Sequence, residues 1–196
     1  MKIIGITGGI GSGKSTIARA LARQGYAVYD CDREAKRIIA EDEEVRKAIV
    51  ALLGEESFVD GRYNTAYVAK RVFEDKSLLE ALNKIVHPAV KRDIIRQSEA
   101  VSFLFVESAI LYEAGLDEIC DKIIEVEAPE EVRIARTIAR DYEGNATEEN
   151  INKVRARIRA QKAVSHQSSA IRFVVNNDGQ KEIEDLREEI LNWTYI

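Results

Sequence analysis

The chain has 196 residues, 45% of them hydrophobic and 32% charged, with a formal net charge of -5 at pH 7. These values are ordinary for one folded unit with its own core, and they exclude a disordered chain. The acidic balance argues against a nucleic-acid partner, and the lack of a long apolar run predicts a cytoplasmic protein that does not enter a membrane.

The first thirty residues predict a strand, a glycine-rich loop, a helix and a second strand. Lys2–Thr7 has the composition of a short buried strand, and apolar residues recur at helical spacing over Ser15–Gln24. Gly25 ends that helix, and Tyr26–Tyr29 is predicted to be the second strand. This order of elements is typical of a parallel α/β sheet.

The loop between the first strand and the helix has the sequence "GGIGSGKS", which matches the phosphate-binding pattern G-x-x-x-x-G-K-[ST]. Its glycines let backbone N–H groups point at phosphates, and the helix that follows adds its positive dipole end. Lys14 is expected to reach the β- and γ-phosphates, and the Ser15 hydroxyl is expected to ligate Mg²⁺. The predicted ATP-binding residues here are Gly9, Ile10, Gly11, Ser12, Gly13, Lys14, Ser15 and Thr16.

Two carboxylates, Asp30 and Asp32, follow the second strand. In a parallel sheet this is the edge where ligands bind, and alternation along an extended segment would point both side chains the same way. A carboxylate there can accept a proton from an attacking hydroxyl and orient it towards the γ-phosphate. Isolated acids at such a place are more often solvated caps, but the phosphate loop favours a catalytic role for at least one of them.

Residues from about 32 to 100 are predicted to form a helical insertion. Turn signals lie at Gly54, Asp60–Gly61 and His87–Pro88. His87 could therefore cap a helix that begins at the proline, and the alternative is a ligand contact.

The next strands are predicted at Val101–Val106 and Lys122–Val126, where apolar residues run almost without interruption. Glu107 follows the first of them at the same sheet edge as the phosphate loop. It either holds Mg²⁺, directly or through water, or caps a helix.

Residues from about 133 to 162 are predicted to form a lid of two helices joined by a polar loop. Arg133, Arg136 and Arg140 are spaced three and four apart and so share one helix face. That face is either a solvated basic surface or a source of cations for the transferring phosphoryl group, and Arg140 beside the loop suits the second role.

The chain is predicted to end with a strand at Phe173–Val175, a turn at Asn177–Gly179 and an amphipathic helix from Lys181 onward. Asn177 is most simply a turn residue, but its place after the last strand also makes it a candidate to face a nucleotide base. The sum of these elements predicts a three-layer α/β fold of the P-loop kinase type, with its core at about 1–31, 101–132 and 163–196. The guanine-reading pattern N-K-x-D is missing, which argues against a GTPase switch.

An ordered set of segments resembles the dephospho-coenzyme A kinase family from Lys2 to about Gly179. The segments are "GITGGIGSGKST", "YAVYDCDREAKRII", "IVHPAV", "ESAILYEAG", "RTIARD", "RAQ" and "VVNNDG". The resemblance implies that ATP phosphorylates the ribose 3′-hydroxyl of dephospho-coenzyme A, the last step of coenzyme A synthesis. We also expect a monomer or weak homo-oligomer, and we expect Mg²⁺ to accompany ATP.

The resemblance implies a role for each matching residue. It implies that Asp32 is the general base, that Arg140 is a cation carried by the lid, and that His87 and Glu113 contact the acceptor. It also implies that the helical insertion at about 32–100 helps to hold the acceptor. The turn with Asn177 and Gly179 becomes an adenine contact.

Three features depart from the family's usual pattern. Ala109 replaces a proline, Arg172 replaces an acid before the last strand, and the lid loop Tyr142–Asn150 is longer. The sequence leaves two alternatives open: a kinase with a nucleotide or sugar acceptor, and a nonenzymatic ATP-binding module.

Overall fold

The computed structural model describes residues 2–161 and 168–196, which form two compact units. The core unit comprises residues 1–29 and 98–196, and the inserted unit comprises residues 30–97. The last residue of the predicted lid, Lys162, lies outside the described residues. No helix within the described part of the chain is long and apolar enough to cross a membrane.

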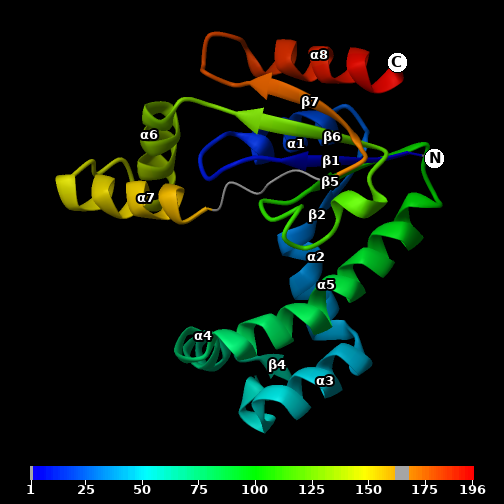
Figure 1. Ribbon diagram of the computed structural model, residues 1–196, viewed down its shortest axis with the longest axis vertical. Coiled ribbons are helices and arrows are strands. Elements are labelled where there is room, and N and C mark those ends of the chain that lie inside the picture. The colour runs from blue at the N-terminus through cyan, green and yellow to red at the C-terminus, as the bar shows by residue number, and fades with distance from the viewer. Residues whose placement is uncertain (1, 162–167) are drawn as a thin grey trace. The chain divides into compact units, whose positions relative to one another are not determined.

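The core unit is built on a five-stranded sheet with the order β2-β5-β1-β6-β7 (Figure 1). Its central pairs, β1 with β5, β1 with β6 and β6 with β7, are parallel. The strands are β1 (Lys2–Thr7), β2 (Ala27–Asp30), β5 (Phe103–Glu107), β6 (Lys122–Glu127) and β7 (Ile171–Asn176). The predicted parallel sheet is therefore confirmed, but the strand expected from Val101 begins two residues later.

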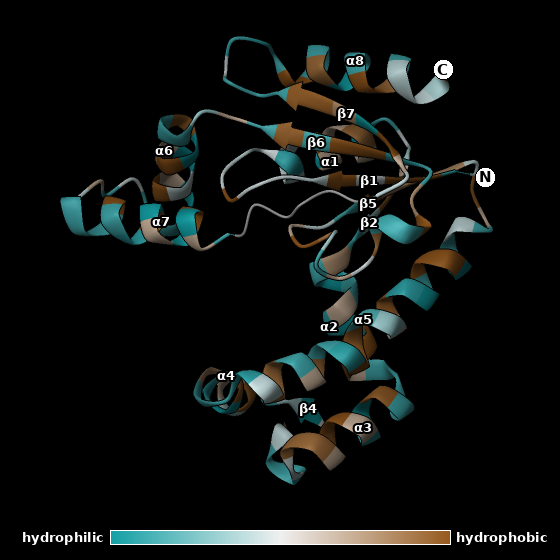
Figure 2. Ribbon diagram, in the orientation of Figure 1, coloured by the Kyte–Doolittle hydropathy of each residue, from teal (hydrophilic) through white to brown (hydrophobic). Residues whose placement is uncertain are grey.

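Two helices of the core unit, α1 (Lys14–Arg23) and α8 (Ile183–Tyr195), share one buried cluster with the sheet. The cluster combines apolar residues of β1, β5, β6 and β7 with one face of each helix, and Figure 2 shows the hydrophobic colour of these strands. Its buried members include Ile4, Ile6, Ile17, Leu21, Phe105, Ile124, Val126, Val175, Leu186 and Ile190. Because these apolar side chains are closely packed, the strands keep fixed positions relative to one another. The loops at the carboxyl ends of the strands therefore start from fixed points.

The two predicted lid helices are α6 (Glu130–Asp141) and α7 (Glu148–Ala160). They pack on each other through Ile134, Ile138, Val154 and Ile158. The Thr147 hydroxyl accepts the backbone N–H of Asn150 at 3.2 Å, so Thr147 is the N-cap of α7. The apolar contact between these four side chains joins α6 and α7 into one helical hairpin.

The inserted unit is mainly helical, as the sequence predicts. It contains α2 (Cys31–Glu41), α3 (Glu43–Leu53), α4 (Thr65–Glu74) and α5 (Lys76–Ser98), with the short hairpin β3 (Phe58–Val59) and β4 (Arg62–Tyr63). The turn predicted at His87–Pro88 is wrong, because α5 continues through Pro88. Proline removes one helical hydrogen bond, and the buried Val86, Ala89 and Val90 on both sides of it keep the helix packed.

Candidate active site

The phosphate loop, residues 8–13, leads from β1 into α1, and three of its glycines, among them Gly11 and Gly13, have positive φ angles that other residues rarely adopt. Gly11 has φ 76° and Gly13 has φ 95°. A Cβ atom on Gly11 would lie 2.4 Å from the backbone oxygen of Arg133, and one on Gly13 would lie 2.1 Å from Nδ2 of Asn177. The loop therefore requires glycine both for its own shape and for close contact with α6 and the turn after β7.

A cation and two oxygen groups meet at the start of α1. The Ser15 hydroxyl donates to Oε1 of Glu107 at 3.0 Å, and Nζ of Lys14 lies 3.8 Å from the same oxygen. The Lys14 and Glu107 side chains are only 14% and 11% exposed. The structure thus brings together Lys14, which was predicted to reach the phosphates, and Ser15 and Glu107, the two candidates for Mg²⁺ contact.

Hydroxyl and carboxylate oxygens are the donors that Mg²⁺ prefers, so Ser15 and Glu107 fit a Mg²⁺ ion that is shared with a nucleotide. Within residues 2–161 and 168–196, no group of three or more His, Cys, Asp or Glu side chains could hold a metal ion alone. Mg²⁺ in kinases commonly takes its other ligands from phosphates and water, so two protein oxygens are sufficient.

Arg133 and Arg136 contact the phosphate loop and are not part of a solvated basic face. Nε of Arg133 donates to the backbone oxygen of Ile10 at 2.8 Å, and Nη1 of Arg136 lies 3.3 Å from the backbone oxygen of Ser12. Oε1 of Gln161 accepts the Ile10 N–H at 2.7 Å. The helical spacing predicted that the arginines share one face of the helix. It did not indicate that this face contacts the phosphate loop.

Arg140 lies one turn beyond Arg136 and is paired with its neighbour. Its Nε donates to Oδ1 of Asp141 at 2.6 Å, and Arg157 of α7 donates to Oδ2 at 2.7 Å. These hydrogen bonds, first that of Arg140 and then that of Arg157, lower the pKa of Asp141 to about 2. The Arg140 side chain is nevertheless 62% exposed, so the end of α6 presents a cation to solvent.

A cavity of about 440 Å³ opens beside the phosphate loop in the core unit. Gly8, Gly9 and Ser12 line one part of it, and Tyr112, Glu113 and Glu125 line another. The buried Ser12 hydroxyl has no hydrogen-bond partner within the described part of the chain, so a ligand in the cavity could supply one. Glu113, for which an acceptor contact was predicted, thus shares a cavity with the loop.

Arg172, a residue that departs from the family's usual pattern, contacts an acid of this cavity. Its Nη1 lies 3.5 Å from Oε1 of Glu125, which also accepts the Tyr112 hydroxyl. Burial, and then the hydrogen bond to Glu125, raises the pKa of Tyr112. Arg172 therefore compensates the charge of Glu125, a pairing between β6 and β7 that local sequence could not reveal.

In the inserted unit, Asp30 and Asp32 occupy different positions at the start of α2. Asp30 is the N-cap, and its Oδ1 accepts the Arg33 N–H at 3.0 Å. Asp32 is exposed in the first helical turn. The predicted parallel orientation of the two side chains is wrong, because the extended backbone ends at Asp30 and the helix begins at Cys31.

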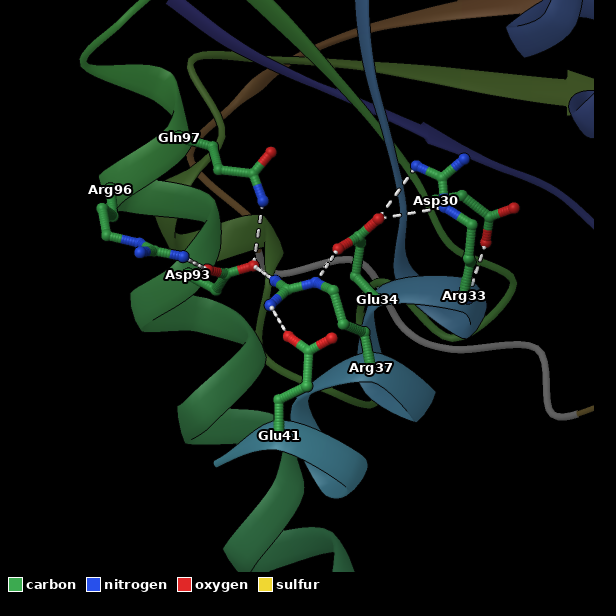
Figure 3. Close-up of polar contacts among 8 residues, drawn as sticks. All are labelled: Asp30, Arg33, Glu34, Arg37, Glu41, Asp93, Arg96 and Gln97. Atoms are coloured by element: carbon green, nitrogen blue, oxygen red, sulfur yellow. Dashed lines mark hydrogen bonds and ion pairs between the residues drawn. The ribbon is translucent and has the colours of Figure 1, made fainter. Parts of the chain in front are cut away.

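A polar network joins α2 to α5 in the inserted unit (Figure 3). Arg37 donates to Glu34 at 2.6 Å, to Glu41 at 3.1 Å and to Asp93 at 2.6 Å. The buried Asp93 also accepts hydrogen bonds from Arg96 and Gln97. The network fixes the helix that carries Asp32 relative to α5, and sequence reasoning did not find it.

His87 lies in the middle of α5, and burial lowers the pKa of its imidazole below the usual 6.5. The unfolded chain then binds this proton more readily, so the free energy of unfolding should fall as the pH drops below about 6.5 and level off below the folded-state pKa. Thermal unfolding of the ligand-free protein between about pH 7.5 and pH 5.5 should show a steeper loss for wild type than for His87→Gln. The other histidine, His166, lies outside the described residues and is common to both proteins, so equal slopes would contradict this prediction.

Comparison with known proteins gives a consistent result over nearly the whole chain. Residues 2–182 match the family model described as dephospho-CoA kinase. A dephospho-CoA kinase from Bacteroides fragilis is 37% identical over 195 residues, which cover 98% of this chain and 92% of that protein.

Solved structures agree with the observed architecture. A crystal structure of a Thermus thermophilus protein is 34% identical, has a TM-score of 0.74, and is matched over 99% of this chain and 96% of that one. A dephospho-CoA kinase from Campylobacter jejuni has a TM-score of 0.65 at 22% identity, with 98% of this chain and 95% of that chain covered. The second likeness supports the fold alone, and together these likenesses confirm the predicted α/β kinase fold.

Proposed function

Because this chain belongs to the dephospho-CoA kinase family, we propose that it transfers a phosphoryl group from ATP to dephospho-CoA, giving coenzyme A and ADP. We further propose that the ribose 3′-hydroxyl of dephospho-CoA accepts the phosphoryl group. The observation that supports phosphoryl transfer most directly is the meeting of Lys14, Ser15 and Glu107 at the end of a glycine loop. We expect a cytoplasmic enzyme that is a monomer or a weak homo-oligomer.

The segment from Gly9 to Thr16 would enclose the ATP phosphates, and the backbone N–H groups of Gly13, Lys14 and Ser15 would donate to them. Lys14 would stabilise the charge that spreads over the transferring phosphoryl, and Arg140 would add a second cation from the lid. Mg²⁺, held by Ser15 and Glu107, would offset charge on the β- and γ-phosphates when it is bound with ATP. The turn that contains Gly179 would contribute to the adenine side.

Asp32 would accept the proton of the acceptor hydroxyl and orient its oxygen for attack on the γ-phosphorus. The new bond would form from that oxygen to phosphorus, and the bond from phosphorus to the oxygen of the leaving ADP would break. His87 and Glu113 are proposed to bind other parts of the acceptor. Catalysis would then consist mainly of positioning and electrostatic stabilisation.

The direct test measures ADP release from ATP and Mg²⁺ with dephospho-CoA, beside reactions without acceptor and with adenosine monophosphate or shikimate. The expected result is ADP release and a product heavier by one phosphate only with dephospho-CoA. Transfer to another acceptor would overturn the assignment of dephospho-CoA as the substrate, but the protein would still be a kinase. Binding of ATP without transfer to any acceptor would instead support a nonenzymatic nucleotide-binding module.

A further inference from the structure

Asn177 and Arg136 form a bracket behind the phosphate loop. Asn177 follows β7 and is only 2% exposed, and its Nδ2 donates to the backbone oxygen of Ser12 at 2.8 Å. Nη1 of Arg136 donates to the same Ser12 oxygen at 3.3 Å and to the backbone oxygen of Asn177 at 2.9 Å. Nη2 of Arg136 donates to Oδ1 of Asn177 at 3.2 Å, which leaves the side-chain amide engaged through both its nitrogen and its oxygen.

The bracket grips one peptide of the loop, the one that joins Ser12 to Gly13. In a planar trans peptide the carbonyl and the N–H point in opposite directions. Anchoring the Ser12 oxygen on Asn177 and Arg136 therefore directs the Gly13 N–H away from the bracket, to the other side of this peptide. The next N–H groups belong to Lys14 and Ser15 at the start of α1, where phosphates bind.

Gly13 makes this close approach possible. Its φ of 95° is unfavourable for any residue with a side chain, and a Cβ there would lie 2.1 Å from Nδ2 of Asn177. The glycine required by the phosphate-binding pattern is therefore also the residue that admits Asn177. These observations indicate that the Asn177 side chain supports the phosphate loop.

We propose that Asn177 and Arg136 are positioning residues that orient the Ser12–Gly13 peptide for phosphate binding. The proposal rests on the proposed function only for the identity of the reaction, since phosphate binding can be measured without an acceptor. It differs from the adenine contact expected for Asn177 from the sequence. A positioning residue affects every ligand that carries the phosphates, whereas a base contact affects only ligands that carry the base.

The test compares the binding of ATP and of inorganic tripolyphosphate, each with Mg²⁺, to the full-length protein and to Asn177→Ala. The variant leaves the Ser12 oxygen with one donor fewer and the Arg136 guanidinium with one acceptor fewer. Loss of buried hydrogen bonds of this kind should weaken binding of both ligands by a similar factor, about 10- to 100-fold. Weaker binding of ATP with unchanged binding of tripolyphosphate would overturn the proposal in favour of a base contact.

Asn176→Ala is the matched control, because Asn176 is exposed and its Nδ2 donates to Oδ2 of Asp178 at 3.3 Å. It should bind both ligands as wild type does, and circular dichroism should confirm that both variants are folded. If Asn177→Ala does not fold, Arg136→Lys replaces it, because lysine retains the charge but not the forked set of donors. The expected result is again an equal loss for both ligands, and unchanged binding of both would overturn the proposal.

The binding test of the bracket and the transfer assay of the proposed function can fail independently. A wild-type protein that binds tripolyphosphate but phosphorylates no acceptor would contradict the proposed function and leave the bracket testable by the same variants. A wild-type protein that binds neither ATP nor tripolyphosphate would overturn both proposals.

Discussion

Asp32→Asn is expected to lower kcat by about 10²- to 10⁴-fold, the usual contribution of a positioned proton acceptor. The amide has nearly the shape of the carboxylate but cannot take a proton from the attacking hydroxyl. Asp32 is exposed in the first turn of α2 and does not serve as its N-cap, so the substitution should leave the helix intact. Initial rates of ADP release at saturating ATP and dephospho-CoA measure the effect.

Asp30→Asn is the matched control for this prediction. Asparagine retains a side-chain oxygen that can accept the Arg33 N–H, so the cap of α2 survives while the charge is removed. Its kcat should stay within a few-fold of wild type, roughly the effect of a remote charge. An unchanged rate for Asp32→Asn, or an equal loss for Asp30→Asn, would show that Asp32 is not the base.

Lys14→Met should reduce kcat/KM for ATP by about 10²- to 10³-fold, as loss of one preorganised donor to a transition-state oxygen typically does. Lys14 is nearly buried and lies 3.8 Å from Glu107, so its ammonium is confined to the corner where phosphates are expected. Methionine fills a similar volume and removes only the charge. Steady-state rates over a range of ATP concentrations, at saturating dephospho-CoA, measure the loss.

Two variants make the Lys14 prediction specific. Lys14→Arg retains a positive charge but not the compact ammonium, and it should also lose activity if the geometry of the corner matters. Lys181→Met removes an exposed lysine that pairs with Glu189, and it should behave as wild type. Full activity of Lys14→Met would mean that the loop does not position the reacting phosphate in the proposed way.

The elements that the sequence predicted well are those specified by local patterns. The phosphate loop is recognisable because its glycines, lysine and serine are consecutive, and β1 and α1 have the periods of a buried strand and an amphipathic helix. Prediction failed where packing overrides a local signal. Pro88 does not interrupt α5, because apolar neighbours on both sides of it are buried.

Local sequence patterns were therefore sufficient to predict the parallel α/β class, the phosphate-binding loop, and Lys14, Ser15 and Glu107 as candidate phosphate or Mg²⁺ contacts. The hydrogen bonds from Arg136 and Asn177 to the Ser12 carbonyl, and the one from Arg37 to Asp93, became visible when the chain was folded. The physical reason is that a periodic pattern reports which face of a helix or strand is covered, whereas hydrogen-bond partners distant in sequence are chosen by the packing of whole elements.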